Sequence, residues 1–155
     1  MYYVKDFIDN YLLISAIVGW FSAQVIKIII ECFDKTERTL LEVLFSTGGM
    51  PSSHSSTVVA LCVASGIQHG LGSGMFAVTA ILAMIVMVDA SGVRYEAGKH
   101  AKLLNKITKE LFSGKPDEVD GALKELVGHT SFQVIMGALL GAVVAVLLAL
   151  PFDKF

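Results

Sequence analysis

Apolar residues in this chain gather in four long stretches that polar segments separate. The first is Leu12–Ile30 and the last is Phe132–Phe152, and each is close to the ~20 residues that a helix needs to cross a bilayer. Between them, Ser52–Gln68 and Met75–Asp89 are shorter and carry more polar residues near one end. All four runs are too long for strands and lack an alternation of period two, so they predict helices.

The connections between these stretches add further elements. The link Gly70–Gly74 is short, which predicts an antiparallel helical hairpin. Residues 99–112 place apolar side chains at helical spacing and lysines on the opposite side. Such a helix fits either the lipid headgroup layer, where it would attract anionic lipid, or a solvated surface with one stripe packed on its neighbours. A second short helix is expected over Asp117–Val127.

Composition points to a membrane protein. Hydrophobic residues make up 54% of the chain and charged residues 17%, whereas soluble domains average roughly 45–50% and about 25%. The net charge of -2 and the lack of a continuous basic arm argue against nucleic-acid binding. Cys32 and Cys62 both lie in apolar runs and cannot form a disulfide framework or a zinc site.

We therefore expect one all-α, polytopic membrane domain over residues 1–155. It would be a helical bundle with about four transmembrane helices and with amphipathic interfacial helices in the 90–131 segment.

Loop charges predict the orientation of this bundle. Four crossings would place both termini on one side of the membrane, with Lys5 and Lys154 as the basic residues there. The loops of the other side carry nine basic residues: Lys35, Arg38, Arg94, Lys99, Lys102, Lys106, Lys109, Lys115 and Lys124. Because an excess of positive loop charge normally stays in the cytoplasm, we expect a multi-pass protein of the cell membrane with both termini outside.

Ionisable residues collect at the cytoplasmic end of the predicted bundle. They are Lys27 in the last turn of the first span, His54 at the start of the second, Asp89 and Arg94 at the end of the third, and His129 before the fourth. Ionisable side chains within spans are costly and usually face a protein interior or a polar cavity. For Lys27 the alternative is a long side chain that reaches out to the membrane interface.

Two predicted helices begin at this end. Helix starts offer unpaired N–H groups and a partial positive charge, which together attract anions, and Ser52, Ser53, Thr130 and Ser131 are suitable capping residues. Two histidines that face a bound anion indicate nucleophilic attack by one and proton transfer by the other. A phosphate ester fits this set better than a carboxylate ester, since the chain has no Gly-x-Ser-x-Gly elbow.

Several motifs resemble those of one family. Pro51-Ser52-Ser53-His54 is similar to the PSGH motif of the type 2 phosphatidic acid phosphatase and vanadium haloperoxidase superfamily. The stretch from Gly128 to Gly141 is similar to that superfamily's G-H-x-x-x-D-V-x-x-G-x-x-x-G motif. Together, GGMPSSHSS, DASGVR and LKELVGH resemble its divergent membrane branch, the acid phosphatase/haloperoxidase-related proteins.

The resemblance implies a role for each matching residue. His129 would be the nucleophile that forms a phosphohistidine, and His54 the general acid that protonates the leaving oxygen. For Asp89 two roles are open from the sequence: it tunes a catalytic histidine, or it pairs structurally with Arg94 or Lys27. The residues implied to bind phosphate are Arg94, Lys27, Ser52, Ser53 and Gly128. The resemblance implies no metal and no cofactor.

The chain departs from the family pattern at three places. Gln133 stands where the family has the aspartate that orients the nucleophile, so either this amide or Asp89 must do that work. The Arg-Pro pair that normally follows the first lysine is absent after Lys27. Arg94 stands at the family's spacing from His100, which makes His100 a rival nucleophile. His129 is favoured over His100 as the nucleophile, because it precedes a predicted helix start and is followed by Gly137 and Gly141.

These features predict a lipid phosphatase that acts on a phosphate monoester while the lipid tails stay in the bilayer. Phosphatidylglycerophosphate is the first candidate, with phosphatidate and polyprenyl phosphates as alternatives. One rival function is a non-catalytic lipid-phosphate-binding or scaffolding protein, which Gln133 and the missing Arg-Pro pair favour. The other is a small transporter or channel, which the one-sided distribution of ionisable residues disfavours. The expected partners are the lipid substrate and the bilayer, nucleic acid is not expected, and a homo-oligomer is compatible with the sequence.

Overall fold

The chain forms helices throughout the part that the structure, a computed structural model, describes: residues 2–33, 49–111 and 128–154. The helices in these ranges are α1 Tyr2–Ile8, α2 Tyr11–Phe33, α4 Ser53–His69, α5 Gly74–Ser91, α6 Val93–Leu111 and α7 Ser131–Ala149. No strand occurs within the described ranges. The prediction of an all-α membrane bundle is confirmed.

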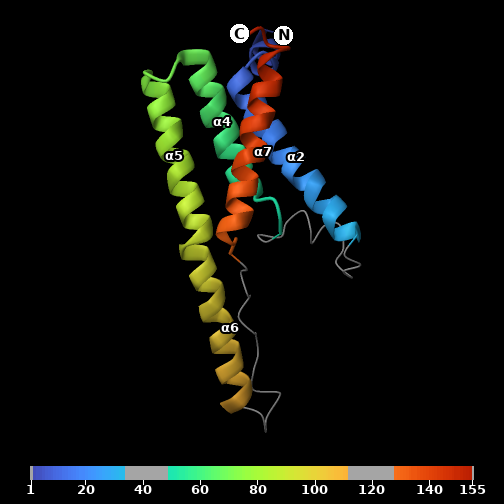
Figure 1. The fold of residues 1–155 in the computed structure, drawn as a ribbon, viewed down its shortest axis with the longest axis vertical. Coiled ribbons are helices and arrows are strands. Elements are labelled where there is room, and N and C mark those ends of the chain that lie inside the picture. The colour runs from blue at the N-terminus through green and yellow to red at the C-terminus, as the bar shows by residue number, and fades with distance from the viewer. Residues whose placement is uncertain (1, 34–48, 112–127, 155) are drawn as a thin grey trace.

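Each of the four apolar stretches becomes one helix, with ends within a few residues of those predicted. Three stretches are long and apolar enough to cross a membrane: α2, α7 and Gly74–Thr108, which consists of α5 and most of α6. α4 is shorter, at 17 residues, and more polar. It contacts α2, α5 and α7, so the most polar of the four helices lies among the others (Figure 1).

Small residues allow the helices around α4 to approach closely. A Cβ added at Gly137 would overlap the carbonyl oxygen of Ser52, and one added at Gly141 would overlap that of Ser56. On the α2 side, the Ser56 hydroxyl donates a hydrogen bond to the Gly19 carbonyl at 2.8 Å. Gly137 and Gly141 therefore form a close-packing seam between α7 and α4.

Both termini lie at one end of the bundle, which we call the terminal end (Figure 1). Tyr11 closes this end: its hydroxyl donates to the Ala145 carbonyl at 2.7 Å, and its ring lies 5.5 Å from that of Phe152. The predicted α4–α5 hairpin turns at the same end through Gly70, whose positive φ of 82° suits glycine. His69 is the last residue of α4 and thus lies at this end of the bundle, far from the candidate site residues.

α6 runs on from α5 in nearly the same direction and projects beyond the other helices (Figure 1). The two helices are separated at Gly92, whose N–H caps α5 by bonding to the Val88 carbonyl. Among the described elements α6 contacts α5 alone, and Leu103 and Leu104 are exposed. No described element therefore covers the apolar stripe of α6. The helix expected over Asp117–Val127 lies outside the described residues.

Candidate active site

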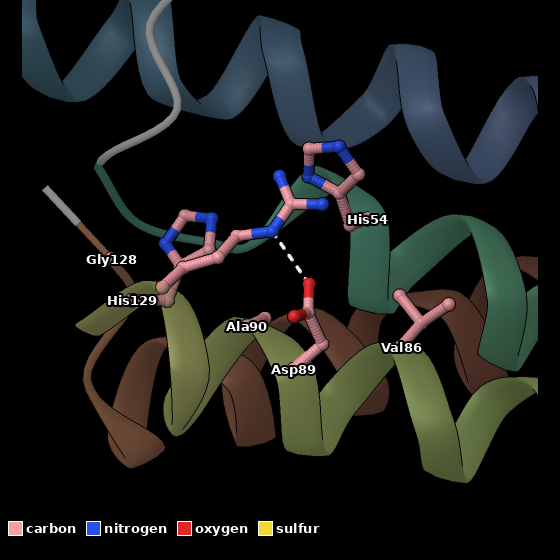
Figure 2. Close-up of a pocket in the computed structure, with 7 residues that line it drawn as sticks. His54, Val86, Asp89, Ala90, Gly128 and His129 are labelled. Carbon is pink, nitrogen blue, oxygen red and sulfur yellow. Dashed lines mark hydrogen bonds and ion pairs between the residues drawn. The ribbon is translucent and has the colours of Figure 1, made fainter. Parts of the chain in front are cut away.

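A pocket lies at the end of the bundle opposite the termini, which we call the pocket end. Its lining residues are His54, Val86, Asp89, Ala90, Arg94, Gly128 and His129. Five of the seven were candidate site residues from the sequence, and they come from α4, α5, α6 and the segment before α7. Figure 2 shows His54, Asp89 and His129 around this pocket, with both imidazole rings on the same side of α5.

Three helices begin at the pocket end. Ser52 is the N-cap of α4, and its hydroxyl accepts a bond from Ser55 N–H at 3.4 Å. Thr130 is the N-cap of α7 and accepts from Gln133 N–H at 3.4 Å. These two starts were predicted. The third start, that of α6 at Val93, arises from the break at Gly92. The helix starts supply unpaired N–H groups and partial positive charge to one region.

Backbone hydrogen bonds join these starts to one another. Ser52 N–H donates to the Gln133 carbonyl at 3.1 Å, across the gap that Gly137 leaves open. His129 N–H donates to the Ala90 carbonyl at 3.1 Å, in the last turn of α5, where carbonyl groups lack helical partners. The two histidine-bearing segments are thereby fixed against the same scaffold.

Gly128 owes its place in the pocket to close packing. A Cβ at this position would overlap the backbone of Arg94 and Tyr95. Only glycine lets the segment before α7 pass so near the first turn of α6. The structure therefore brings His129 and Arg94 together although they are far apart in the sequence.

His129 is buried, with 3% of its surface exposed. Its Nδ1 lies 3.3 Å from the side-chain oxygen Oε1 of Gln133, and its Nε2 has no hydrogen-bond partner among the described residues. Burial holds the pKa of His129 below its ordinary value of about 6.5. The bond with Gln133 opposes this shift, and the positive charges of Lys27, His54 and Arg94 reinforce it. The imidazole is therefore neutral near pH 7, and one ring nitrogen carries a lone pair.

Lys27 is even more deeply buried, with 2% of its surface exposed. Its Nζ lies 3.5 Å from the Ser53 hydroxyl, and its side-chain carbons pass close to Gly49. The alternative in which Lys27 reaches out to the interface is therefore wrong. Burial of this cation costs free energy, and the charge of Glu31, one turn further along α2, offsets part of that cost. A negatively charged ligand beside Nζ would offset more of it.

Arg94 and Asp89 form an ion pair at the mouth of the pocket. Arg94 Nε donates to Asp89 Oδ2 at 2.6 Å, and both side chains are partly exposed. Within the described part of the chain this contact uses Nε, which leaves the two terminal guanidinium nitrogens for a ligand. The carboxylate of Asp89 therefore pairs with Arg94, whereas the side chain beside His129 is that of Gln133.

The remaining histidines differ in position. His54 is exposed in the first turn of α4 and lines the pocket. His100 is exposed on α6 and is not among the lining residues. The structure thus brings His129, and not His100, to the pocket. Val86 and Ala90 also line it, and their apolar side chains gave no sequence signal that separates them from the rest of α5.

These features define a helical membrane protein with a cationic, histidine-bearing pocket at the joined starts of three helices. The chain belongs to the Divergent PAP2 family, whose model matches residues 8–144. The family resemblance of the motifs is thereby confirmed. The chain is also 38% identical over 154 residues to the "Uncharacterized membrane protein YuiD" of Bacillus subtilis (strain 168), and the match covers 93% of this chain and 97% of that protein. No solved structure matches the chain.

Proposed function

We propose that this protein is a membrane phosphatase that hydrolyses a phosphate monoester of a lipid through a phosphohistidine at His129. The observation that carries the proposal is the environment of His129. Its ring is buried, Nδ1 contacts an amide oxygen, Nε2 has no partner among the described residues, and the pocket it lines also holds His54 and Arg94. Membership in a PAP2-related family supports the same chemistry.

A lipid substrate fits the position of the pocket. α5 supplies Val86 and Ala90 to the lining, and other apolar side chains of α5 are exposed, among them Ile81, Ile85 and Val88. A lipid could place its tails along this surface while its phosphate enters the pocket at the helix starts. Phosphatidylglycerophosphate is the first candidate substrate, and phosphatidate and polyprenyl phosphates are the next.

The reaction would proceed in two steps. The lone pair of His129 Nε2 attacks phosphorus, and the ester P–O bond breaks as the leaving oxygen takes a proton from His54 and departs as the lipid alcohol. His54, now neutral, takes a proton from water as the water oxygen attacks the phosphohistidine. The N–P bond breaks, its electron pair returns to Nε2, and inorganic phosphate leaves.

The positive groups at the pocket end would stabilise the transferring phosphoryl group. The terminal nitrogens of Arg94, the buried Nζ of Lys27 and the N–H groups at the start of α4, at Ser53, can each meet a phosphoryl oxygen. Fixed donors of this kind act without reorganisation as charge moves to those oxygens.

Release of inorganic phosphate tests the proposal. The purified protein in detergent is given each lipid phosphate without added metal, and His129→Ala is compared with His69→Ala and His100→Ala. We expect His129→Ala to lower turnover by about a thousandfold or more, and the two control variants to retain it. Equal turnover in the wild type and His129→Ala, or loss in His100→Ala alone, contradicts the assignment.

The pocket end is proposed to face the cytoplasm because basic residues of α6 gather there. A cysteine placed at exposed Lys102, in a chain with Cys32→Ser, should react with a membrane-impermeant maleimide after cells are permeabilised. Labelling from outside intact cells would reverse the orientation.

A second function is favoured by one observation, the neutral Gln133 beside His129. A lipid-phosphate-binding protein would keep the cationic pocket and need no carboxylate at this position. Binding of the lipid phosphate without phosphate release, lost in Arg94→Ala, would support this function over catalysis.

A further inference from the structure

The helix α6 begins in the wall of the pocket and ends beyond the bundle. Its first turn holds Arg94, which lines the pocket, and its later turns project past the other helices (Figure 1). We propose that the apolar stripe of Leu103, Leu104 and Ile107 docks on the headgroup layer of a bilayer that contains anionic lipid, and that this docking widens the pocket. The docking is independent of the proposed function, whereas its effect on turnover rests on that function.

The surface of α6 has the chemistry of a helix that binds anionic lipid. The side chains of its apolar stripe are 58%, 49% and 42% exposed. A second exposed stripe carries positive charge at helical spacing: Lys99, Lys102 and Lys106. Lys99 also pairs with Glu96, yet the helix keeps an excess of positive charge, with five basic and two acidic residues. Such a helix lies in the headgroup layer with its apolar side chains in the acyl boundary and its lysines near lipid phosphates.

The length of α5 places α6 at this layer. α5 has 18 residues and is therefore about 27 Å long, close to the ~30 Å of the hydrocarbon core of a bilayer. A helix that starts just after α5 thus starts among the headgroups. The rival occupant of the stripe is a second copy of the chain. Two parallel copies in one bilayer would bring like-charged α6 helices together, which costs free energy, whereas anionic headgroups neutralise that charge.

The break at Gly92 allows α6 to turn toward the headgroup layer. The backbone there has φ -108° and ψ -86°, outside the helical region, and glycine tolerates more backbone conformations than other residues. Among the described elements α6 contacts α5 alone, and the ion pair of Arg94 with Asp89 that spans the break is partly exposed. α6 can therefore change direction without disturbing the packing among α2, α4 and α7.

The size of the pocket explains why a turn of α6 would matter. The cavity volume open to the centre of a water molecule is about 20 Å³, and one water needs roughly 10–15 Å³ on that measure, so a phosphoryl group requires a wider pocket. The backbone of Arg94 and Tyr95 forms the wall beside Gly128. A turn about Gly92 moves this wall away from Gly128. Because Arg94 lies only two residues from Gly92, its displacement is small and its guanidinium can still reach the phosphoryl group.

The depth of α6 in the bilayer tests the docking without any substrate. A fluorophore is attached at Leu104→Cys, in a chain with Cys32→Ser and Cys62→Ser, and the protein is reconstituted in phosphatidylcholine vesicles with or without phosphatidylserine. Nitroxide groups on the lipid tails should quench the fluorophore strongly when phosphatidylserine is present and weakly when it is absent. The same fluorophore at Ala101→Cys, on another side of α6, should stay weakly quenched in both.

Charge variants sharpen this test. Lys102→Gln and Lys106→Gln should each lower the ratio of docked to undocked helix by about fivefold, the effect of one basic residue near an anionic surface, and added salt should act in the same direction. Lys5→Gln, at the exposed terminal end, should leave the ratio unchanged. Quenching at position 104 that is absent, or that does not depend on phosphatidylserine, overturns the docking. A lipid-independent disulfide between two copies of Leu104→Cys would identify α6 as a dimer contact and overturn it too.

Turnover tests the effect on the pocket. Short-chain phosphatidate added to the same vesicles should be hydrolysed severalfold faster when phosphatidylserine is present. The double variant Lys102→Gln/Lys106→Gln should lose this stimulation and keep the wild-type rate in phosphatidylcholine alone, since neither lysine lines the pocket. An active protein whose rate is the same with and without phosphatidylserine contradicts the widening of the pocket. If α6 docks as expected but no form of the protein releases phosphate, the docking stands and the proposed function fails.

Discussion

The two ends of the bundle are built from the same helices but differ in chemistry. At the terminal end, Tyr11 and Phe152 pack together and the Tyr11 hydroxyl bonds to the Ala145 carbonyl. At the pocket end, buried Lys27 and His129 lie near the exposed ion pair of Arg94 and Asp89. Burying ionisable groups costs free energy, and closing a bundle does not require it. The contrast therefore supports the proposal that the pocket end is the functional one.

Helix direction explains why chemistry collects at one end. α4, α6 and α7 begin at the pocket end, and α2 and α5 end there. The start of α4 carries His54 and the start of α7 follows His129, so unpaired N–H groups lie beside both histidines. α4 and α7 finish at the terminal end, where carbonyl groups point outward. His69 lies in the last turn of α4 and is exposed. His69 is therefore solvated at the terminal end, whereas His129 is buried beside a helix start at the pocket end.

Among the variants that compare the two ends without removing a catalytic group, the largest effect is expected from Gly128→Ala, which disturbs the close approach that the pocket requires. The added Cβ would overlap the backbone of Arg94 and Tyr95, so the segment before α7 must move and His129 must leave Arg94. Displacement of reacting groups by about 1 Å can cost on the order of a hundredfold in rate. We expect kcat/KM for lipid phosphate to fall at least that far.

Gly72→Ala is the matched control at the terminal end, because a Cβ there meets nothing within 4 Å. This variant should retain wild-type turnover and melting temperature. If Gly128→Ala is as active as Gly72→Ala, the packing of Gly128 does not position the site.

A smaller effect is expected from Lys27→Met, which removes the buried cation. Turnover should fall by roughly tenfold to a hundredfold, as one charged contact to the transferring phosphoryl group is lost. Lys27 helps to hold the pKa of His129 down, so its removal raises that pKa. His129 then becomes protonated at higher pH, and the acidic limb of the kcat/KM profile should move upward.

Stability distinguishes this role of Lys27 from a structural one. A buried charge carries a desolvation cost, and methionine fills a similar volume without that cost, so the melting temperature should not fall. Lys5→Met, at the exposed terminal end, should change neither property. A large drop in stability with an unshifted pH profile would make Lys27 a structural residue.

Most of the fold could be predicted because apolar length and helix polarity are local properties. The helix over Ser53–His69 was expected as Ser52–Gln68, and its hairpin with α5 was expected from the short link at Gly70–Gly74. The start of α6 at Val93 was not, because the residues before Lys99 lack a continuous apolar stripe. The sequence also cannot tell that α6 keeps the direction of α5 past Gly92, since the chain could equally turn there.

For the site, the sequence predicted which residues would meet but not how they contact one another. His54, Asp89, Arg94 and His129 were placed together because each lies at the same end of a helix. The hydrogen-bond partner of each residue could not be predicted from the sequence, because it depends on the side-chain rotamer, and the surrounding packing decides that rotamer. Gln133 is the clearest case: its spacing from Thr130 indicates a capping box, and only the structure shows that the same oxygen contacts His129.

The smallest effect is expected from Tyr11→Phe, which changes the terminal end alone. The variant keeps the ring packing with Phe152 and loses the 2.7 Å bond to the Ala145 carbonyl. Interhelical hydrogen bonds in membrane proteins contribute about 0.6 kcal/mol on average, so the free energy of unfolding should fall by about that amount. Turnover should be unchanged, because this contact lies at the opposite end from the pocket. Unfolding in mixed detergent and phosphate release, measured on the same samples, test both halves. A parallel loss of turnover would mean that the two ends are coupled through α7, and their separation into a closing end and a functional end would then be wrong.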